Sequence, residues 1–121
     1  MRKTTVLAFN EDLTSQLRAD GNIFQTIGDL EAALQTPEGR RDAGLYKYRG
    51  NLFVLIGRYR EAVEDFSTAI RLNPEYAEAW YNRAIARILE GNRPDACYDF
   101  ERAAALGYGR GEEKSGYFCA F

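Results

Sequence analysis

Few side chains in this 121-residue chain are of the types that carry out catalysis. Histidine, the commonest general base and zinc ligand, is absent from the sequence. Eighteen Asp and Glu residues could supply a pair of carboxylates for acid–base chemistry, but no spacing singles out one pair. The glycines between 107 and 111 lack the Lys-Ser or Lys-Thr that follows in a phosphate-binding loop. We therefore expect a chain that is not an enzyme and that needs no metal or cofactor.

Cys97 and Cys119 are the two thiols of the chain, and no histidine is present to activate either as a nucleophile. We expect both to be reduced and packed among helices, and a disulfide between them is the alternative. The first ten residues hold too few apolar side chains for a secretory signal, so the sequence favours a cytoplasmic location. A disulfide would weaken that assignment.

Charge and hydropathy argue against two classes of partner. Sixteen Lys and Arg residues against eighteen Asp and Glu give a formal net charge of −2, so there is no broad basic field for nucleic acid. No stretch approaches the roughly 18 apolar residues that cross a bilayer. We therefore expect no nucleic-acid partner and no membrane partner, which leaves another protein or a peptide.

The side chains that could bind such a partner lie in a segment that occurs twice. Residues 43–76 align with residues 77–110 without a gap and share nine identities, where about two are expected from composition. The identical pairs are Ala43/Ala77, Arg49/Arg83, Leu55/Leu89, Gly57/Gly91, Ala62/Ala96, Asp65/Asp99, Phe66/Phe100, Ala69/Ala103 and Leu72/Leu106. Their spacing is helical, and Gly57 and then Asn73-Pro74 can end successive helices. Each copy therefore predicts a pair of helices.

Small residues and repeated charges indicate how the helices pack. Gly50 and Ala62 in the first copy, and Ala84 and Ala96 in the second, would let the two helices of a pair approach closely, with Phe66 or Phe100 filling the seam. Arginine and aspartate also recur at one spacing, as Arg49 with Asp65 and as Arg83 with Asp99. We predict that each arginine forms an ion pair with its aspartate and serves the fold.

The repeated pattern resembles a known family. Tyr46-x2-Arg49-Gly50-x2-Phe53, Gly57-x-Tyr59, Ala62-x3-Phe66-x2-Ala69 and Pro74 are similar to the tetratricopeptide repeat, and Trp80-x2-Arg83-Ala84, Gly91 and Ala96-x3-Phe100-x2-Ala103 repeat it. The second copy departs from the pattern at Arg87, Glu90 and Tyr108. The resemblance implies a right-handed superhelix of stacked helix pairs, with the first helix of each pair lining an inner wall that binds ligands.

The inner wall carries a mixture of amide, aromatic and aliphatic side chains, which suits an extended peptide or a partner helix. We predict a partner-binding surface on this wall; it consists of Lys47, Tyr48, Asn51, Val54, Tyr81, Asn82, Ile85 and Leu89. The alternative is that an N-terminal helical hairpin covers several of the apolar members.

Three of these residues resemble part of a carboxylate clamp. In tetratricopeptide co-chaperones the clamp grips the C-terminal carboxylates of heat-shock chaperones, and Lys47, Asn51 and Asn82 stand at three of its positions. The other two positions hold Glu112 and Gly116 where Lys and Arg are expected. An acidic side chain repels a carboxylate, so we do not expect a complete clamp.

The predicted architecture is an all-α single domain of about seven helices, formed as a stack of antiparallel helix pairs. It comprises a degenerate helical hairpin at 10–37, repeats at 43–76 and 77–110, and a C-terminal capping helix at 111–121. Tyr117 and Phe118 should be buried if the cap docks, and an undocked tail could produce a homodimer. The predicted function is a non-catalytic scaffold that binds protein or peptide; the alternative is a self-associating structural module.

Overall fold

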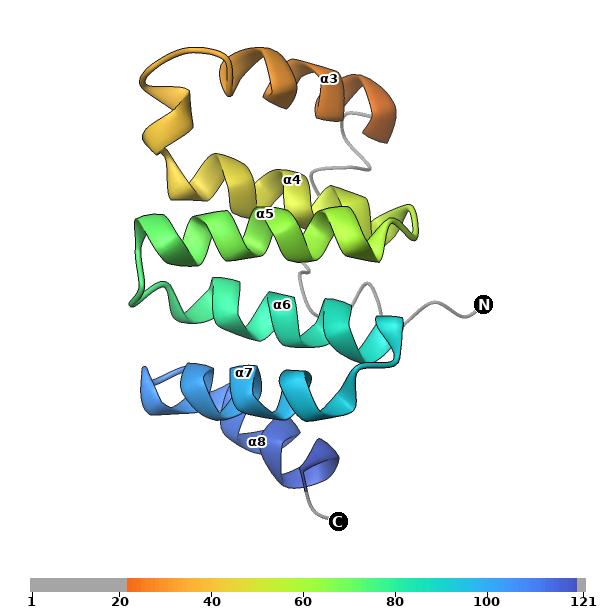
Figure 1. Cartoon of the computed structure of the whole chain (residues 1–121), viewed down its shortest axis with the longest axis vertical. Coiled ribbons are helices and arrows are strands. Elements are labelled where there is room, and N and C mark those ends of the chain that lie inside the picture. Colours follow the sequence, from red (N-terminus) through yellow and green to blue (C-terminus); the bar gives the residue numbers. More distant parts are fainter. Residues whose placement is uncertain (1–21, 120–121) are drawn as a thin grey trace.

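The computed structural model describes residues 22–119, which form a stack of helices (Figure 1). Six α-helices and one 3₁₀ turn occur in this range, which confirms the all-α prediction for the described residues. They are α3 (Ile23–Ala33), the 3₁₀ turn η1 (Gly39–Arg41), α4 (Ala43–Leu55), α5 (Tyr59–Leu72), α6 (Ala77–Glu90), α7 (Arg93–Ala105) and α8 (Gly109–Phe118). The first part of the hairpin expected at 10–37, up to residue 21, lies outside the described residues.

Helix ends follow the local sequence. Gly57 has a φ of 82°, a left-handed conformation that glycine adopts without strain, and the N–H of Arg58 turns back to the carbonyl of Phe53 at 2.8 Å. The predicted end of α4 at Gly57 is therefore confirmed. Asn92 caps the start of α7, because its side chain accepts a hydrogen bond from the backbone N–H of Asp95.

The two helices of each pair meet across small residues, as predicted. A Cβ added to Gly50 would lie 2.6 Å from a ring carbon of Phe66, so no larger side chain fits there without displacing the ring. Ala62, Ala84 and Ala96 are fully buried. Phe66 and Phe100 are also fully buried, in equivalent positions of α5 and α7. Close packing of this kind fixes the distance between the helices.

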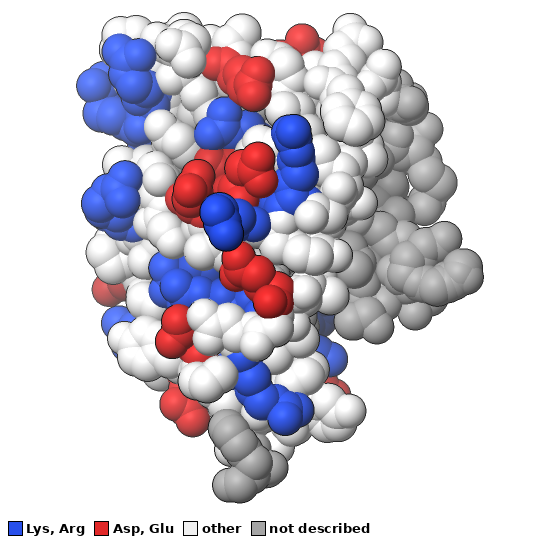
Figure 2. Space-filling view, turned by 45° about the vertical axis from the view of Figure 1, so that its right-hand side comes forward, with Lys and Arg blue, Asp and Glu red and all other residues white. Residues whose placement is uncertain are grey.

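The predicted arginine–aspartate pairs are confirmed. Arg49 donates to both carboxylate oxygens of Asp65 at 2.8 Å, and Arg83 donates to both oxygens of Asp99 at 2.9 Å. The hydrogen bonds with Asp65 raise the pKa of Arg49 despite its partial burial. Figure 2 shows basic and acidic side chains interspersed on one face of the stack.

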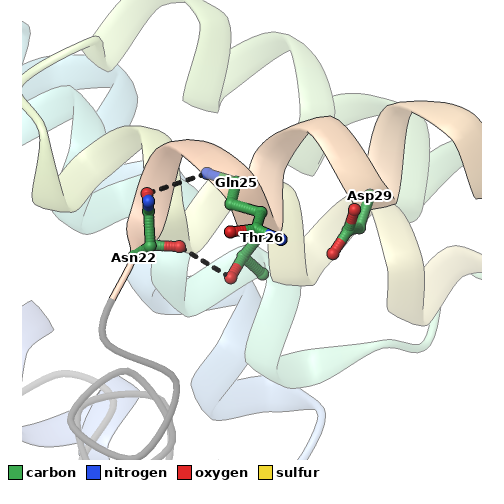
Figure 3. Close-up of a pocket in the computed structure, with 4 residues that line it drawn as sticks. All are labelled: Asn22, Gln25, Thr26 and Asp29. Atoms are coloured by element: carbon green, nitrogen blue, oxygen red, sulfur yellow. Dashed lines mark hydrogen bonds between the residues drawn. The ribbon is translucent and has the colours of Figure 1, made fainter.

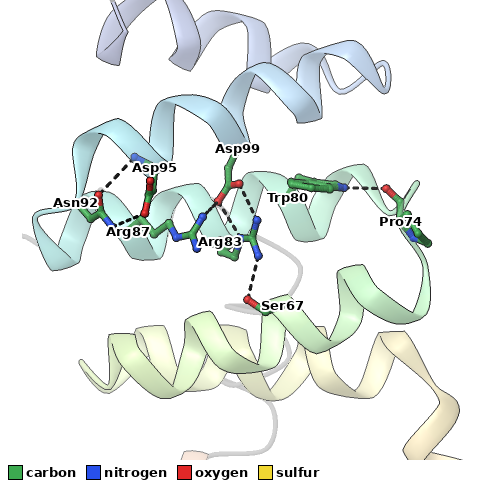
Figure 4. Close-up of polar contacts among 8 residues, drawn as sticks. All are labelled: Ser67, Pro74, Trp80, Arg83, Arg87, Asn92, Asp95 and Asp99. Carbon is green, nitrogen blue, oxygen red and sulfur yellow. Dashed lines mark hydrogen bonds and ion pairs between the residues drawn. The ribbon is translucent and has the colours of Figure 1, made fainter.

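Asp99 has further contacts that the sequence did not reveal. Arg87 donates to Oδ2 of Asp99 at 2.8 Å, so two arginines share this fully buried carboxylate. Arg83 also donates to the hydroxyl of Ser67 at 3.0 Å, which links α6 to α5 of the preceding pair (Figure 4). The second ion pair therefore connects the two helix pairs, as well as the two helices of its own pair.

The C-terminal helix corrects two expectations. Cys97 and Cys119 form a disulfide, so the expectation of two reduced thiols is wrong. Phe118 is half-buried and stacks on Phe100 with ring centroids 5.7 Å apart. Tyr117, which we expected to be buried with it, is 73% exposed. The two neighbours point to different sides of α8 because successive residues of a helix are about 100° apart.

At the other end of the described structure, α3 packs on the stack with the apolar side chains of Ile27 and Leu30, and Leu34 follows the helix. Phe24, in the first turn of the same helix, is 68% exposed. None of the helices between residues 22 and 119 is long and apolar enough to span a bilayer.

Candidate partner-binding surface

Four polar side chains connect α4 with α6, the first helices of the two pairs. Lys47 on α4 donates to Oε1 of Glu78 on α6 at 2.8 Å. Asn82 on α6 donates through Nδ2 to Oδ1 of Asn51 on α4, also at 2.8 Å. We call Lys47, Asn51, Glu78 and Asn82 the polar seam. Lys47, Asn51 and Asn82 were selected from the sequence as binding residues, and the structure brings them to one boundary between two helices.

The amide pair of the polar seam is deeply buried. Asn51 is 1% exposed and Asn82 is 0% exposed. Oδ1 of Asn82 has no hydrogen-bond partner in the described structure. A buried polar atom without a partner costs about 1–3 kcal/mol of stability, so such atoms are rare in folded proteins and need an explanation.

The ion pair of the polar seam is more accessible than the amide pair. The side chain of Lys47 is 17% exposed and that of Glu78 is 35% exposed. Burial lowers the pKa of Lys47, but the hydrogen bond and charge of Glu78, together with Tyr76, outweigh burial and raise it. The ammonium also lies 5.5 Å from the ring centroid of Tyr76. Lys47 therefore stays charged at neutral pH.

Aromatic side chains flank the polar seam on the side of α8. The ring of Tyr81 lies 5.5 Å from that of Phe100 and 4.9 Å from that of Tyr108. Burial raises the pKa of Tyr81 to about 12. Burial also raises the pKa of Tyr108, and the charge of Glu78 adds to that shift. Tyr81 thus supports the core with its ring as well as bordering the seam.

The eight residues proposed from the sequence divide into two groups by accessibility. Lys47, Tyr48 and Leu89 are partly exposed. Asn51, Val54, Tyr81, Asn82 and Ile85 are buried, with at most 5% of each residue exposed. A partner that meets the surface as it stands would therefore touch the first group, and access to the second requires a movement of neighbouring side chains or helices.

Tyr76 and Tyr108 border this surface but were not among the residues selected from the sequence. Each immediately precedes a helix: Tyr76 precedes α6 and Tyr108 precedes α8. An aromatic residue directly before the first helix of a pair is the signal that could have identified both. Their rings reach back toward Lys47 and Tyr81 respectively.

A separate polar hollow of about 320 Å³ lies along α3 and is lined by Asn22, Gln25, Thr26 and Asp29 (Figure 3). Asn22 caps α3 by accepting from the N–H of Gln25, and its carbonyl accepts from the hydroxyl of Thr26. These groups are engaged in starting the helix. Among residues 22–119, no group of three or more Cys, Asp or Glu side chains is placed to hold a metal ion.

Comparisons of sequence place the chain among known proteins. Residues 50–89 match the family model described as TPR repeat. Tetratricopeptide repeat protein 36 of Bos taurus is 51% identical over 55 residues, which are 46% of this chain and 29% of that protein. Its counterpart in Danio rerio is 35% identical over 112 residues, covering 83% of this chain and 60% of that protein.

A DnaJ homolog subfamily C member 7 homolog of Dictyostelium discoideum is 34% identical over 68 residues, covering 56% of this chain and 13% of that protein. This chain therefore spans less than two thirds of the length of each of these three relatives.

Solved structures share the fold at low sequence identity. The first TPR of Spaghetti (RPAP3), bound to the HSP90 peptide SRMEEVD, superimposes with a TM-score of 0.78 at 17% identity, covering 98% of this chain and 94% of that one. The second TPR domain of human RPAP3, in complex with the HSP70 peptide SGPTIEEVD, gives 0.76 at 21% identity and covers 98% of both chains. These structures show the same fold of stacked helix pairs, and the sequence matches identify a tetratricopeptide repeat within this chain, at residues 50–89.

Proposed function

We propose that the chain is a non-catalytic scaffold that binds a segment of another protein along the polar seam and the side chains beside it. The match of residues 50–89 to the tetratricopeptide repeat model, and a fold shared with domains bound to peptides, support a protein-binding role. The finer assignment, to the inner face of α4 and α6, is the proposal. It includes Lys47, Tyr48 and Leu89 as the first contacts.

The observation that carries the proposal is the incomplete hydrogen bonding of Asn82. Its Oδ1 is buried without a partner, while its Nδ2 is held by Asn51. A peptide N–H or a hydroxyl that reached this oxygen would complete the amide pair, and the unsatisfied state would no longer cost stability. A core built only for packing has no need of two facing asparagines, because apolar residues of similar size fill such a seam.

Lys47 is the second anchor that we propose. A carboxylate of the partner would replace Glu78 at its ammonium, and Glu78, with 35% of its side chain exposed, can turn outward into water. The exchange of one carboxylate for another keeps Lys47 paired, so it avoids the penalty of an uncompensated buried charge. The partner that fits is an extended segment with an acidic group and a backbone donor close to it.

The peptide SRMEEVD is a suitable probe, because it is acidic and binds a domain of the same fold. We expect fluorescence anisotropy to show micromolar binding at about 0.1 M salt, weakened about tenfold or more by Lys47→Ala. The matched control is Arg60→Ala, which removes a positive charge from the exposed side of α5 and should leave affinity unchanged. No binding to the wild-type chain, or equal losses in both variants, would contradict the proposal.

The same peptide with an amidated C-terminus tests the narrower idea of a carboxylate clamp. Glu112 and Gly116 occupy α8 where the clamp pattern expects Lys and Arg. We therefore expect the free and amidated peptides to bind with similar affinity, through side-chain carboxylates. Strong selectivity for the free C-terminus would establish the clamp instead.

A second candidate function is self-association, because both ends of the described stack expose a large aromatic side chain. Phe24 on α3 is 68% exposed and Tyr117 on α8 is 73% exposed. Contact between the ends of two copies would cover both rings. Light scattering over a range of concentrations decides this, since a molecular mass that stays at 13.7 kDa excludes it.

We also propose a cytoplasmic location for the scaffold. The disulfide between Cys97 and Cys119 weakens this assignment, which requires the bond to be one of the transient, redox-sensing disulfides that occur in reducing compartments. Subcellular fractionation with alkylation of thiols at the moment of lysis would test both the location and the state of the pair.

A further inference from the structure

Cys97 lies on α7 and Cys119 directly follows α8, and the disulfide between them fixes the far end of α8 to its neighbour. We propose that this disulfide is a reversible latch that docks α8 when oxidised and releases it when reduced, and so regulates the partner-binding surface. The regulatory part of this inference rests on the proposed function, whereas the docking of α8 does not.

The first argument is that α8 has little to hold it as a helix. It has ten residues, fewer than the roughly 12–15 at which an isolated helix becomes even marginally stable in water. Three of them, Gly109, Gly111 and Gly116, are glycines, which disfavour helix, and no side chain caps its start. Gly111 is the one buried residue of α8. The helix therefore depends on what attaches it to α7.

α8 packs along α7, and its closest backbone approach and its aromatic contact lie near the two ends of the helix. Gly111 rests against the backbone of α7, where an added Cβ would lie 2.8 Å from the nitrogen of Ala104. Phe118 stacks on Phe100 at 5.7 Å, and the guanidinium of Arg93 lies 5.7 Å from the Phe118 ring. Phe118 directly precedes Cys119, so the disulfide holds its ring at the Phe100 contact.

The second argument is that α8 is joined to the polar seam through Tyr108. Tyr108 directly precedes α8, and its ring centroid lies 4.9 Å from that of Tyr81. Tyr81 adjoins Asn82, the buried amide of the seam. Release of α8 would remove Tyr108 from Tyr81 and admit water beside Asn82. A docked α8 therefore keeps the surface formed before a partner arrives.

The bond forms by thiol–disulfide exchange with a low-molecular-weight disulfide such as oxidised glutathione. The thiolate of Cys119, the more accessible sulfur, attacks one sulfur of the small disulfide, and the first small thiol leaves. The thiolate of Cys97 then attacks the sulfur of Cys119, and the second small thiol leaves. The two cysteines lose two electrons to the oxidant, and their two protons pass to the two small thiolates released. Reduced glutathione reverses both steps.

Hydrogen–deuterium exchange of the full chain tests the latch directly. We expect the amides of 109–118 to exchange at least about tenfold faster after reduction with glutathione, while those of α5 and α6 keep their protection. The Cys97→Ser, Cys119→Ser double variant should behave like the reduced chain. Unchanged exchange in 109–118, or a bond that glutathione reduces only when the whole chain unfolds, would overturn the latch.

Two measurements test whether the latch affects the partner-binding surface, and one of them needs no ligand. Titration of tyrosinate absorbance should show Tyr81 ionising at lower pH in the reduced chain, because loss of Tyr108 exposes it. SRMEEVD should bind about tenfold more weakly to the reduced chain than to the oxidised one. Equal titration curves or equal affinities would overturn the coupling. Absence of peptide binding in both states would refute the proposed function, and the exchange and titration data would still decide the latch.

Discussion

The two helix pairs and the helix that follows them are held in place by different means. In α4–α5 and α6–α7 the seams contain fully buried phenylalanine and alanine, and each pair encloses an aspartate bound by arginine. In α8 one glycine is buried, one phenylalanine is half-buried, and a disulfide joins the end of the helix to α7. The comparison teaches that the repeated pairs are stabilised by buried side chains and ion pairs, whereas the terminal helix buries little of its own surface and is held to its neighbour by a covalent bond as well.

The largest effect should come from the most buried charge of the pairs. Asp99→Ala leaves Arg83 and Arg87 without their shared carboxylate, and removal of one member of a buried ion pair costs about 3–5 kcal/mol. Chemical denaturation should show this loss. Glu101→Ala, an exposed position on the same helix, is the control and should change stability little.

Asp65→Ala tests the same comparison at lower cost, because among the described residues Asp65 pairs with one arginine, Arg49, and is slightly exposed. We expect a smaller loss than for Asp99→Ala. Equal losses would mean that the second arginine and Ser67 add nothing to the second pair.

A larger side chain at the contact between the two helices of a pair should have the next largest effect. Ala96 is fully buried in α7, and Ala96→Leu forces the two helices of the pair apart, at about 1–3 kcal/mol. Thermal unfolding measures this loss. Ala105→Leu adds the same atoms to an exposed position of α7 and should be nearly neutral. An unchanged melting temperature for Ala96→Leu would refute the close contact between helices.

Alkaline pH should weaken the contact between the second pair and α8. The pKa of Tyr81 is raised to about 12 in the folded chain, against about 10 when unfolded, so the folded chain keeps a proton that the unfolded chain loses. Its contribution to stability is complete below pH ~10 and is lost as pH rises toward ~12, by about 1–2 kcal/mol. Tyr81→Phe should remove this part of the slope in urea denaturation, and an identical slope would contradict the assignment.

The helix pairs could be predicted from the sequence because their causes are local or repeated. Gly57 ends a helix through its own backbone, and the spacing from Arg49 to Asp65 recurs between Arg83 and Asp99. When a contact occurs in both copies, its two residues recur in the sequence at the same spacing, and chance does not account for that recurrence. Arg87, the second arginine bound to Asp99, occurs in one copy only, so nothing in the sequence marks it.

The surface and the C-terminal end were harder to predict. The repeat pattern indicated that Lys47, Asn51 and Asn82 share one face, but not that Glu78 holds the lysine or that both amides are buried. Burial depends on how closely α4 and α6 approach, which is a property of the whole stack. The disulfide likewise depends on where α8 ends against α7, and two cysteines 22 residues apart do not reveal it.

The smallest predicted effect concerns Gly111 and Gly116, two glycines of α8 with different surroundings. A Cβ on Gly116 meets nothing within 4 Å, so Gly116→Ala should stabilise the helix by about 0.5–1 kcal/mol through propensity alone. A Cβ on Gly111 would meet backbone atoms of α7 at 2.8 Å, so Gly111→Ala gains the same propensity but pushes the helix off its neighbour. Hydrogen exchange in 109–118 should therefore slow in the first variant and accelerate in the second. If both variants slow exchange, the stability of α8 is set by its own helix propensity. The close approach to α7 would then contribute nothing to its docking.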